Sequence, residues 1–113
     1  MIKITIYKNQ EEEYVGFQCE GHAGYAEHGH DIVCSAVSIL VINTINAIEK
    51  FTYDKFKGES EEEKGFIEFM FHSEPSAEPT LLIDTMILGL ESIRESLSET
   101  SDESYLLLTF KEV

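Results

Sequence analysis

Residues 31–48 read DIVCSAVSILVINTINAI, and residues 32–48 of this stretch are the longest apolar region of a 113-residue chain. Its apolar residues recur every three or four positions, which predicts an α-helix beginning near Asp31. Residues expected on one face are Val33, Val37, Leu40, Val41, Thr44 and Ile48, with Ile39, Ile42 and Ile45 extending that face sideways. Such a helix needs burial on more than one side, either between a sheet and a second helix or at a subunit interface. Serine, threonine and asparagine residues interrupt the apolar region, which is therefore expected to be too short and too polar for a membrane span.

Two strands are predicted before this helix. Residues 2–7 alternate between isoleucine and the polar or aromatic residues Lys3, Thr5 and Tyr7, which is the period of a half-buried strand. Residues 14–19, YVGFQC, form the second expected strand, and the acidic turn between them predicts a hairpin.

Two further strands, a helix and a last strand are predicted after it. Residues 51–57 and 65–71 are expected to pair as a hairpin through the acidic loop 58–64, with Ile67, Phe69 and Phe71 on one face. Residues 80–97 have helical spacing, with Pro79 placed for a helix start. Residues 104–111 predict an apolar strand in the interior of the sheet. The expected fold is a single α+β (mixed α/β) domain over residues 1–113, in the order ββαββαβ, with one mixed sheet of about five strands and two helices.

The composition excludes some partners and favours others. Twenty-two acidic residues against eight basic ones give a formal charge of -14, and no local basic patch offsets it. Direct nucleic-acid binding is therefore not expected, whereas a basic protein or peptide is a suitable partner. The sequence MIKITIYKNQEEE has no export signal, so a cytoplasmic location is expected, with Cys19 and Cys34 reduced.

The candidate site lies in the stretch GHAGYAEHGHDIVCSAVS, residues 21–38. With Asp31 as the N-cap, Cys34 is expected in the first turn of the helix, where free backbone N–H groups stabilise a thiolate. His22, flanked by Gly21 and Ala23 at the end of a strand, is the leading candidate for its base. A buried, inert cysteine is the alternative reading of Cys34.

A metal site is a second alternative, since Cys19, His22, His28, His30 and Cys34 together offer enough ligands. Their spacing matches no paired-knuckle pattern, so no metal or other cofactor is expected, and His28 and His30 are interpreted as exposed loop residues. Gly21, Gly24 and Gly29 match no phosphate-binding fingerprint and are interpreted as giving mobility to a substrate-admitting loop. Ser38 lies one helical turn beyond Cys34 on the same face. No role is expected for His72, and Cys19 is expected in the core.

The combination of Gly21-His22-Ala23 with Gly29 and Asp31-Ile32-Val33-Cys34, followed by Ala36-Val37-Ser38, resembles the ribosomal-processing cysteine protease family, Prp. Ser35 stands where many members carry alanine. The resemblance covers the whole chain in length and element order.

This resemblance implies an endopeptidase that removes a short N-terminal extension from a large-subunit ribosomal protein, the twenty-seventh of the L series. It implies Cys34 as nucleophile, His22 as general base, Asp31 and Ser38 as supporting residues, and a homodimer. The alternative function is an acidic, dimeric module that binds a basic ribosomal protein or peptide without cutting it.

Overall fold

A computed structural model describes residues 2–21, 30–61, 65–98 and 106–113. Its elements are β1 (Ile2–Lys8), β2 (Tyr14–Glu20), α1 (His30–Phe51), β3 (Phe56–Glu61), β4 (Phe66–Phe71), α2 (Ala77–Ser98) and β5 (Leu106–Glu112). The order ββαββαβ and the mixed sheet with two helices confirm the predicted fold class.

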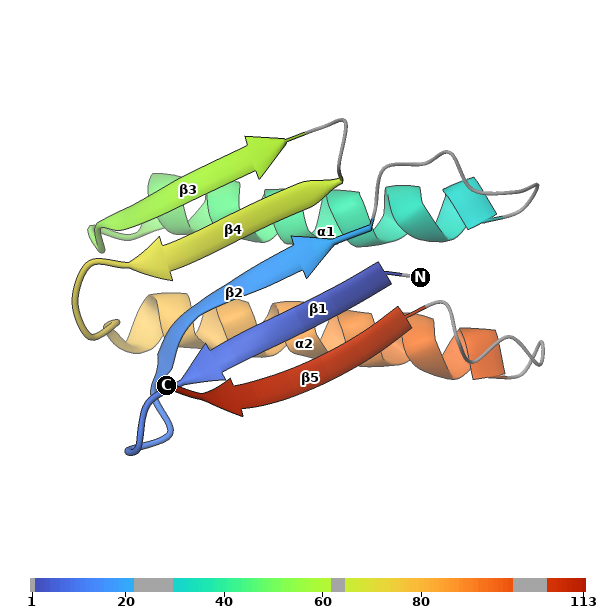
Figure 1. The fold of residues 1–113 in the computed structure, drawn as a ribbon. Helices are drawn as coiled ribbons and strands as arrows, with labels where there is room; N and C mark the ends of the chain where they lie inside the picture. The colour runs from blue at the N-terminus through green and yellow to red at the C-terminus, as the bar shows by residue number, and fades with distance from the viewer. Residues whose placement is uncertain (1, 22–29, 62–64, 99–105) are drawn as a thin grey trace.

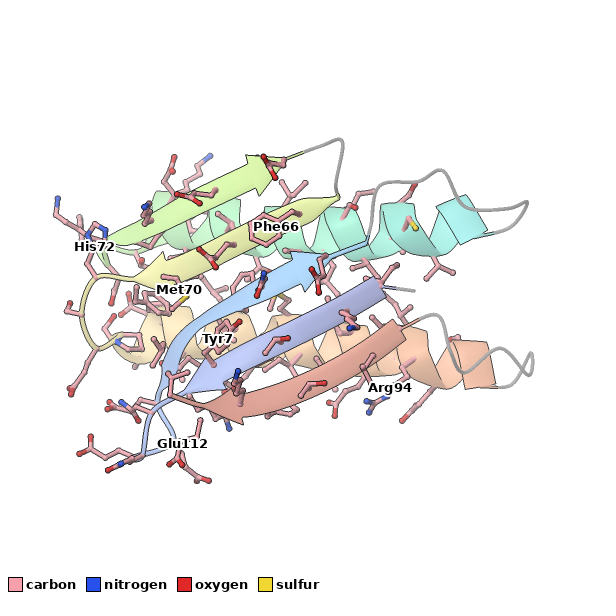
Figure 2. The ribbon with its side chains drawn as sticks, in the orientation of Figure 1. Tyr7, Phe66, Met70, His72, Arg94 and Glu112 are labelled. Atoms are coloured by element: carbon pink, nitrogen blue, oxygen red, sulfur yellow. The ribbon has the colours of Figure 1, made fainter. Side chains whose placement is uncertain are left out.

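The five strands form one sheet in the order β3-β4-β2-β1-β5. All neighbours are antiparallel except β1 and β5, which run parallel with Ile2 opposite Leu106. Both helices lie behind the sheet in Figure 1, α1 behind β3 and β4 and α2 behind the other half, so the domain has two layers. Tyr7, Phe66 and Met70 project from the opposite, helix-free face (Figure 2).

The core lies between the sheet and the helices, where the predicted alternation and helical periodicity place their apolar residues. Ile2, Ile4 and Ile6 are buried on β1 as expected. The ring of Phe69 on β4 stacks on Phe17 of β2 at a centroid distance of 4.9 Å. Helix residues buried against this layer are Cys34, Val37, Val41, Ile48, Ile83, Met86, Ile87 and Leu90.

Burial of α1 follows the prediction only in part. The predicted face is buried against the sheet, and Leu40 packs against α2 so closely that a Cβ added at Gly89 would lie 2.7 Å from its Cδ2 atom. Ile39 and Ile42, however, are 69% and 45% exposed in the single chain. Contrary to expectation, Val33–Phe51 is long and apolar enough to cross a membrane by length and composition alone, a property that core helices share.

Three predicted boundaries were wrong. Residues 51–55 are not a strand, because α1 continues to Phe51 and the backbone N–H of Thr52 still bonds to the Ile48 carbonyl at 3.2 Å. The strand lies instead at Phe56–Glu61, where pairing with β4 extends it into the predicted loop. The second helix begins at Ala77, so Pro79 occupies its first turn, where a missing N–H costs nothing.

The last strand was also misplaced. β5 is an edge strand rather than an interior one, since it pairs only with β1 among the described strands. Leu106 and Leu108 are buried, whereas Leu107 and Phe110 are about half exposed, at 46% and 49%. Leu107 lies on the face opposite Leu106 and Leu108, whereas Phe110 shares their face but lies nearer the end of the strand, so the apolar run does not reflect burial on both sides.

Candidate active site

Cys34 lies near the start of α1, at the end of the domain where β2 finishes. α1 begins at His30, so Asp31 is already inside the helix and is not its N-cap, and Cys34 is the fifth helical residue rather than a member of the first turn. Helical side chains point back toward the N-terminus, so the thiol still faces the positive end of the helix dipole. Only 6% of Cys34 is exposed, and it belongs to the core cluster.

Cys19 approaches Cys34 from the sheet. It is the second-last residue of β2, fully buried and turned toward the helices between Ile4 and Ile67 of the neighbouring strands. The pKa of the Cys19 thiol is raised to about 12, mainly by burial and to a smaller extent by the neighbouring Cys34 and Glu20. Both cysteines are free.

This environment separates the two thiols chemically. At neutral pH the Cys19 thiol is protonated and out of contact with solvent, so it cannot act as a nucleophile. Cys34 is left as the candidate. The expectation that Cys19 packs in the core is confirmed, but its proximity to Cys34 was not predicted, although the alternation of β2 already placed it on the helix-facing side.

Gly21 has a conformational role that the sequence alone did not show. It follows β2 directly and has a φ of 88°, a backbone conformation that side-chain-bearing residues rarely adopt. This left-handed turn sets the direction in which the chain leaves the sheet toward residue 22. A glycine is therefore required here by geometry.

The remaining predicted site residues are only partly described. Ser38 is half-buried one helical turn after Cys34, on the same side of α1, as expected. His22, Ala23, Gly24, His28 and Gly29 lie outside the described residues, and nothing is described of the side chains of His30 and Asp31. The pairing of Cys34 with His22 and the alternative metal site thus stay predictions.

His72 is far from this site. It follows β4 and is exposed at the end of the sheet opposite the start of α1 (Figure 2). Its backbone N–H donates to the Lys55 carbonyl at 3.0 Å, which extends the β3–β4 pairing by one residue pair at the open end of the hairpin. Its position agrees with the expectation that it takes no part in the chemistry around Cys34.

Comparison with known proteins decides the family. The model of the family described as cysteine protease Prp matches residues 1–102. The chain belongs to the Prp cysteine protease family. It is therefore a peptide hydrolase of the thiol class, and the Prp resemblance read from residues 21–38 is confirmed.

Individual Prp proteins agree with this over nearly the whole chain. The ribosomal processing cysteine protease Prp of Bacillus subtilis is 34% identical over 97 residues, covering 82% of this chain and 87% of the relative. The Staphylococcus aureus protein of the same description is 29% identical over 105 residues, covering 93% and 99%.

Solved Prp structures share the fold. The essential ribosomal processing protease Prp from S. aureus, in complex with a substrate peptide, superposes with a TM-score of 0.87 at 26% identity, covering 98% of this chain and 100% of that one. The same protein with a covalently linked product peptide gives a TM-score of 0.83 at 27% identity and the same coverage. A Streptococcus mutans structure, at 23% identity and a TM-score of 0.81, shows the shared fold alone.

Proposed function

We propose that this Prp-family chain is a ribosomal processing endopeptidase that uses Cys34 and His22 to remove the N-terminal extension of a large-subunit ribosomal protein, the twenty-seventh of the L series. The observation that carries the proposal is the position of Cys34, near the N-terminal end of α1 and next to the end of β2. The other cysteine, Cys19, has no exposed surface and a thiol pKa raised to about 12, whereas Cys34 is 6% exposed, so Cys34 is the better candidate of the two.

The proposed reaction is acyl transfer. His22 accepts the thiol proton, and the Cys34 thiolate attacks the scissile carbonyl to form a tetrahedral intermediate. Collapse of this intermediate breaks the peptide C–N bond, with His22 returning the proton to the leaving amine, and leaves a thioester on Cys34. Water, deprotonated by His22, then hydrolyses the thioester and releases the free thiol.

The helix start supports the charge that develops in this reaction. Backbone N–H groups in the first turn of α1 have no acceptor within the helix and carry the positive end of its dipole. Donors of this kind stabilise an oxyanion, which gives the tetrahedral intermediate a place to form. Asp31 lies in that turn and Ser38 one turn beyond Cys34, where we propose that both support the site.

The substrate class is proposed from the relatives and from charge. The curated relatives are described as ribosomal processing proteases, and the S. aureus protein has been solved with a substrate peptide. A net charge of -14 attracts basic proteins such as ribosomal proteins and repels nucleic acid. We also propose a cytoplasmic location, because the proposed partners are ribosomal proteins.

Replacing Cys34 tests the nucleophile directly. Cys34→Ala and Cys34→Ser are expected to abolish cleavage of the extended ribosomal protein, measured by mass spectrometry of the products. Both should retain the wild-type circular dichroism spectrum, since either change removes or alters one core atom. Normal turnover by either variant would contradict the assignment of Cys34.

Replacing the histidines one at a time tests the base. His22→Ala is expected to lower kcat by about two to four orders of magnitude, the usual contribution of a general base. His28→Ala and His30→Ala are the matched controls and should have mild effects. A large loss in either control, with His22→Ala active, would show that the wrong histidine was chosen.

We further propose a homodimer. The support is the apolar surface that the single chain leaves open on its helical layer, where Ile39, Leu81 and Leu88 are each more than 60% exposed. Sedimentation velocity measures the oligomeric state, and a monomer at micromolar concentration would contradict the proposal.

A further inference from the structure

β3 extends beyond the helix layer and leaves an open groove beside α1. Its helix-facing positions are Phe56, Gly58 and Ser60, which lie opposite Phe71, Phe69 and Ile67 of β4. In a covered sheet these positions would be buried, yet Gly58 and Ser60 are exposed. α1 therefore covers β4 and the start of β3 at Phe56, but leaves the rest of this edge strand open.

Two adjoining cavities form this groove. One, of about 260 Å³, is lined by Ile42 and Ile45 of α1 and by Gly58, Ser60 and Ile67 among others. The other, of about 720 Å³, also includes Ile45 and Gly58 and continues toward Tyr53 and His72. Because Ile45 and Gly58 line both cavities, the two form one channel along the outer side of α1.

The groove combines three features that suit an extended peptide. Its floor is apolar, and β3 is the sheet edge, so its outer backbone groups have no neighbouring strand among the described elements. An extended chain can add to such an edge by main-chain hydrogen bonds and place alternate side chains into an apolar channel. The groove contains the carboxylates of Glu49 and Asp54 against the ammonium group of Lys55, and Glu59 and Glu68 border it at strand positions that face the other side of the sheet. This charge attracts a peptide with basic residues among its apolar ones.

We propose that this β3–α1 groove binds the peptide substrate in extended form, on one side of the bond that Cys34 cleaves. The proposal rests on the proposed protease function and adds to it a second contact region remote from the thiol. Substrate recognition would then depend on residues that take no part in the chemistry.

The rise per residue of α1 gives the distance from Cys34 to the groove. Ile42 and Glu49 are two and about four turns along α1 from Cys34, or roughly 12 and 22 Å at 1.5 Å per residue. An extended peptide advances about 3.3 Å per residue, so substrate residues roughly four to seven positions from the scissile bond would occupy the groove. A peptide with only three residues on each side of the bond would not enter it.

Gly58 allows the groove to be filled without disturbing the fold. A Cβ atom at this position would meet nothing nearer than Phe56 Cε1 at 3.7 Å, and the backbone φ imposes no strain. Gly58→Phe is therefore expected to fold and to occupy the channel. Thr109→Phe is the matched control, because it adds the same side chain at an exposed position of the other edge strand, β5.

The test compares two peptides that span the cleavage site of the extended ribosomal protein, one with eight residues on each side of the bond and one with three. For Gly58→Phe we expect KM for the long peptide to rise about tenfold or more with kcat unchanged within about twofold, and no change for the short peptide. Thr109→Phe should match wild type on both. Equal KM values for Gly58→Phe and wild type on the long peptide would overturn the proposal.

Binding separates failure of the groove from failure of the proposed function. The Cys34→Ala protein, with and without Gly58→Phe, is titrated with the fluorescently labelled long peptide and followed by anisotropy. Tight binding that Gly58→Phe weakens about tenfold supports the groove even if the wild type does not cut this peptide. If Gly58→Phe leaves peptide affinity unchanged but converts a dimer to a monomer in sedimentation, the groove is occupied by a second copy of the chain, and the proposal is wrong.

Discussion

The pKa of Cys19 predicts a specific loss of stability at high pH. The thiol titrates at about 12 in the folded chain against an ordinary value of 9.0, because burial disfavours the thiolate. Between these two values the folded state holds a proton that the unfolded state has lost. The free energy of unfolding is thus unaffected by this group below pH 9 and falls as the pH rises from 9 toward 12.

The magnitude follows from the two pKa values. At pH 8 ionisation of Cys19 in the unfolded state changes the free energy of unfolding by almost nothing. At pH 10 this ionisation stabilises the unfolded state by about RT ln 11, so the free energy of unfolding falls by about 1.4 kcal/mol. Urea unfolding at pH 8 and at pH 10 measures this loss. Cys19→Ala should lack it, so the difference between the two pH values should be about 1.4 kcal/mol smaller in the variant than in wild type.

A control keeps the interpretation on Cys19. Cys34→Ala retains the buried Cys19 thiol and should show the wild-type loss between pH 8 and pH 10. An equal loss in wild type and in Cys19→Ala would refute the argument that burial keeps Cys19 protonated. It would also remove the reason for excluding Cys19 as the nucleophile.

Iodoacetamide at pH 8 should modify Cys34 but not Cys19 in the folded chain, with both modified in urea; peptide mapping that finds Cys19 labelled without denaturant would contradict its burial. Gly16→Ala should lower stability by about 2–3 kcal/mol or more, because the new Cβ would lie 2.2 Å from the Phe69 carbonyl oxygen and 2.9 Å from Met70 Cα. A melting temperature like that of wild type would refute this close approach of β2 and β4. Gly21→Ala should cost about 1–2 kcal/mol for its φ of 88° and reduce cleavage, whereas unchanged kinetics and stability would show that the turn after β2 tolerates a side chain. Gly89→Leu should cost about 1–3 kcal/mol by separating α1 from α2 at Leu40, and thermal melting with no shift would show that the helices repack freely.

The parts of the fold that depend on local periodicity were predictable. The alternation of residues 2–7 and the helical spacing from Val33 to Ile48 depend on which residues face the core, and the structure confirms both patterns. The position of β3 depends instead on its pairing with β4. The polar residues 58–61, GESE, have no strand-like pattern from which this pairing could be predicted. Phe51 and Tyr53 gave residues 51–57 a strand-like pattern, although α1 continues to Phe51.

The edge position of β5 was unpredictable for a related reason. Its composition resembles that of an interior strand, but its neighbours are set by a parallel pairing with β1 from the other end of the sequence. In the site, the location of Cys34 near a helix start was predicted to within a turn. The apposition of Cys19 was not, because it depends on how α1 crosses the sheet.

The pairing of β1 with β5 has a consequence for how the protein comes into being. These strands are roughly a hundred residues apart in sequence, and contacts of such separation form slowly because a long loop must close first. During synthesis, β1 leaves the ribosome early and has no partner on this side until Leu106 and Leu108 emerge. A nascent chain therefore cannot complete this side of its core before β5 has left the ribosome, and until then β1 is an unpaired sheet edge.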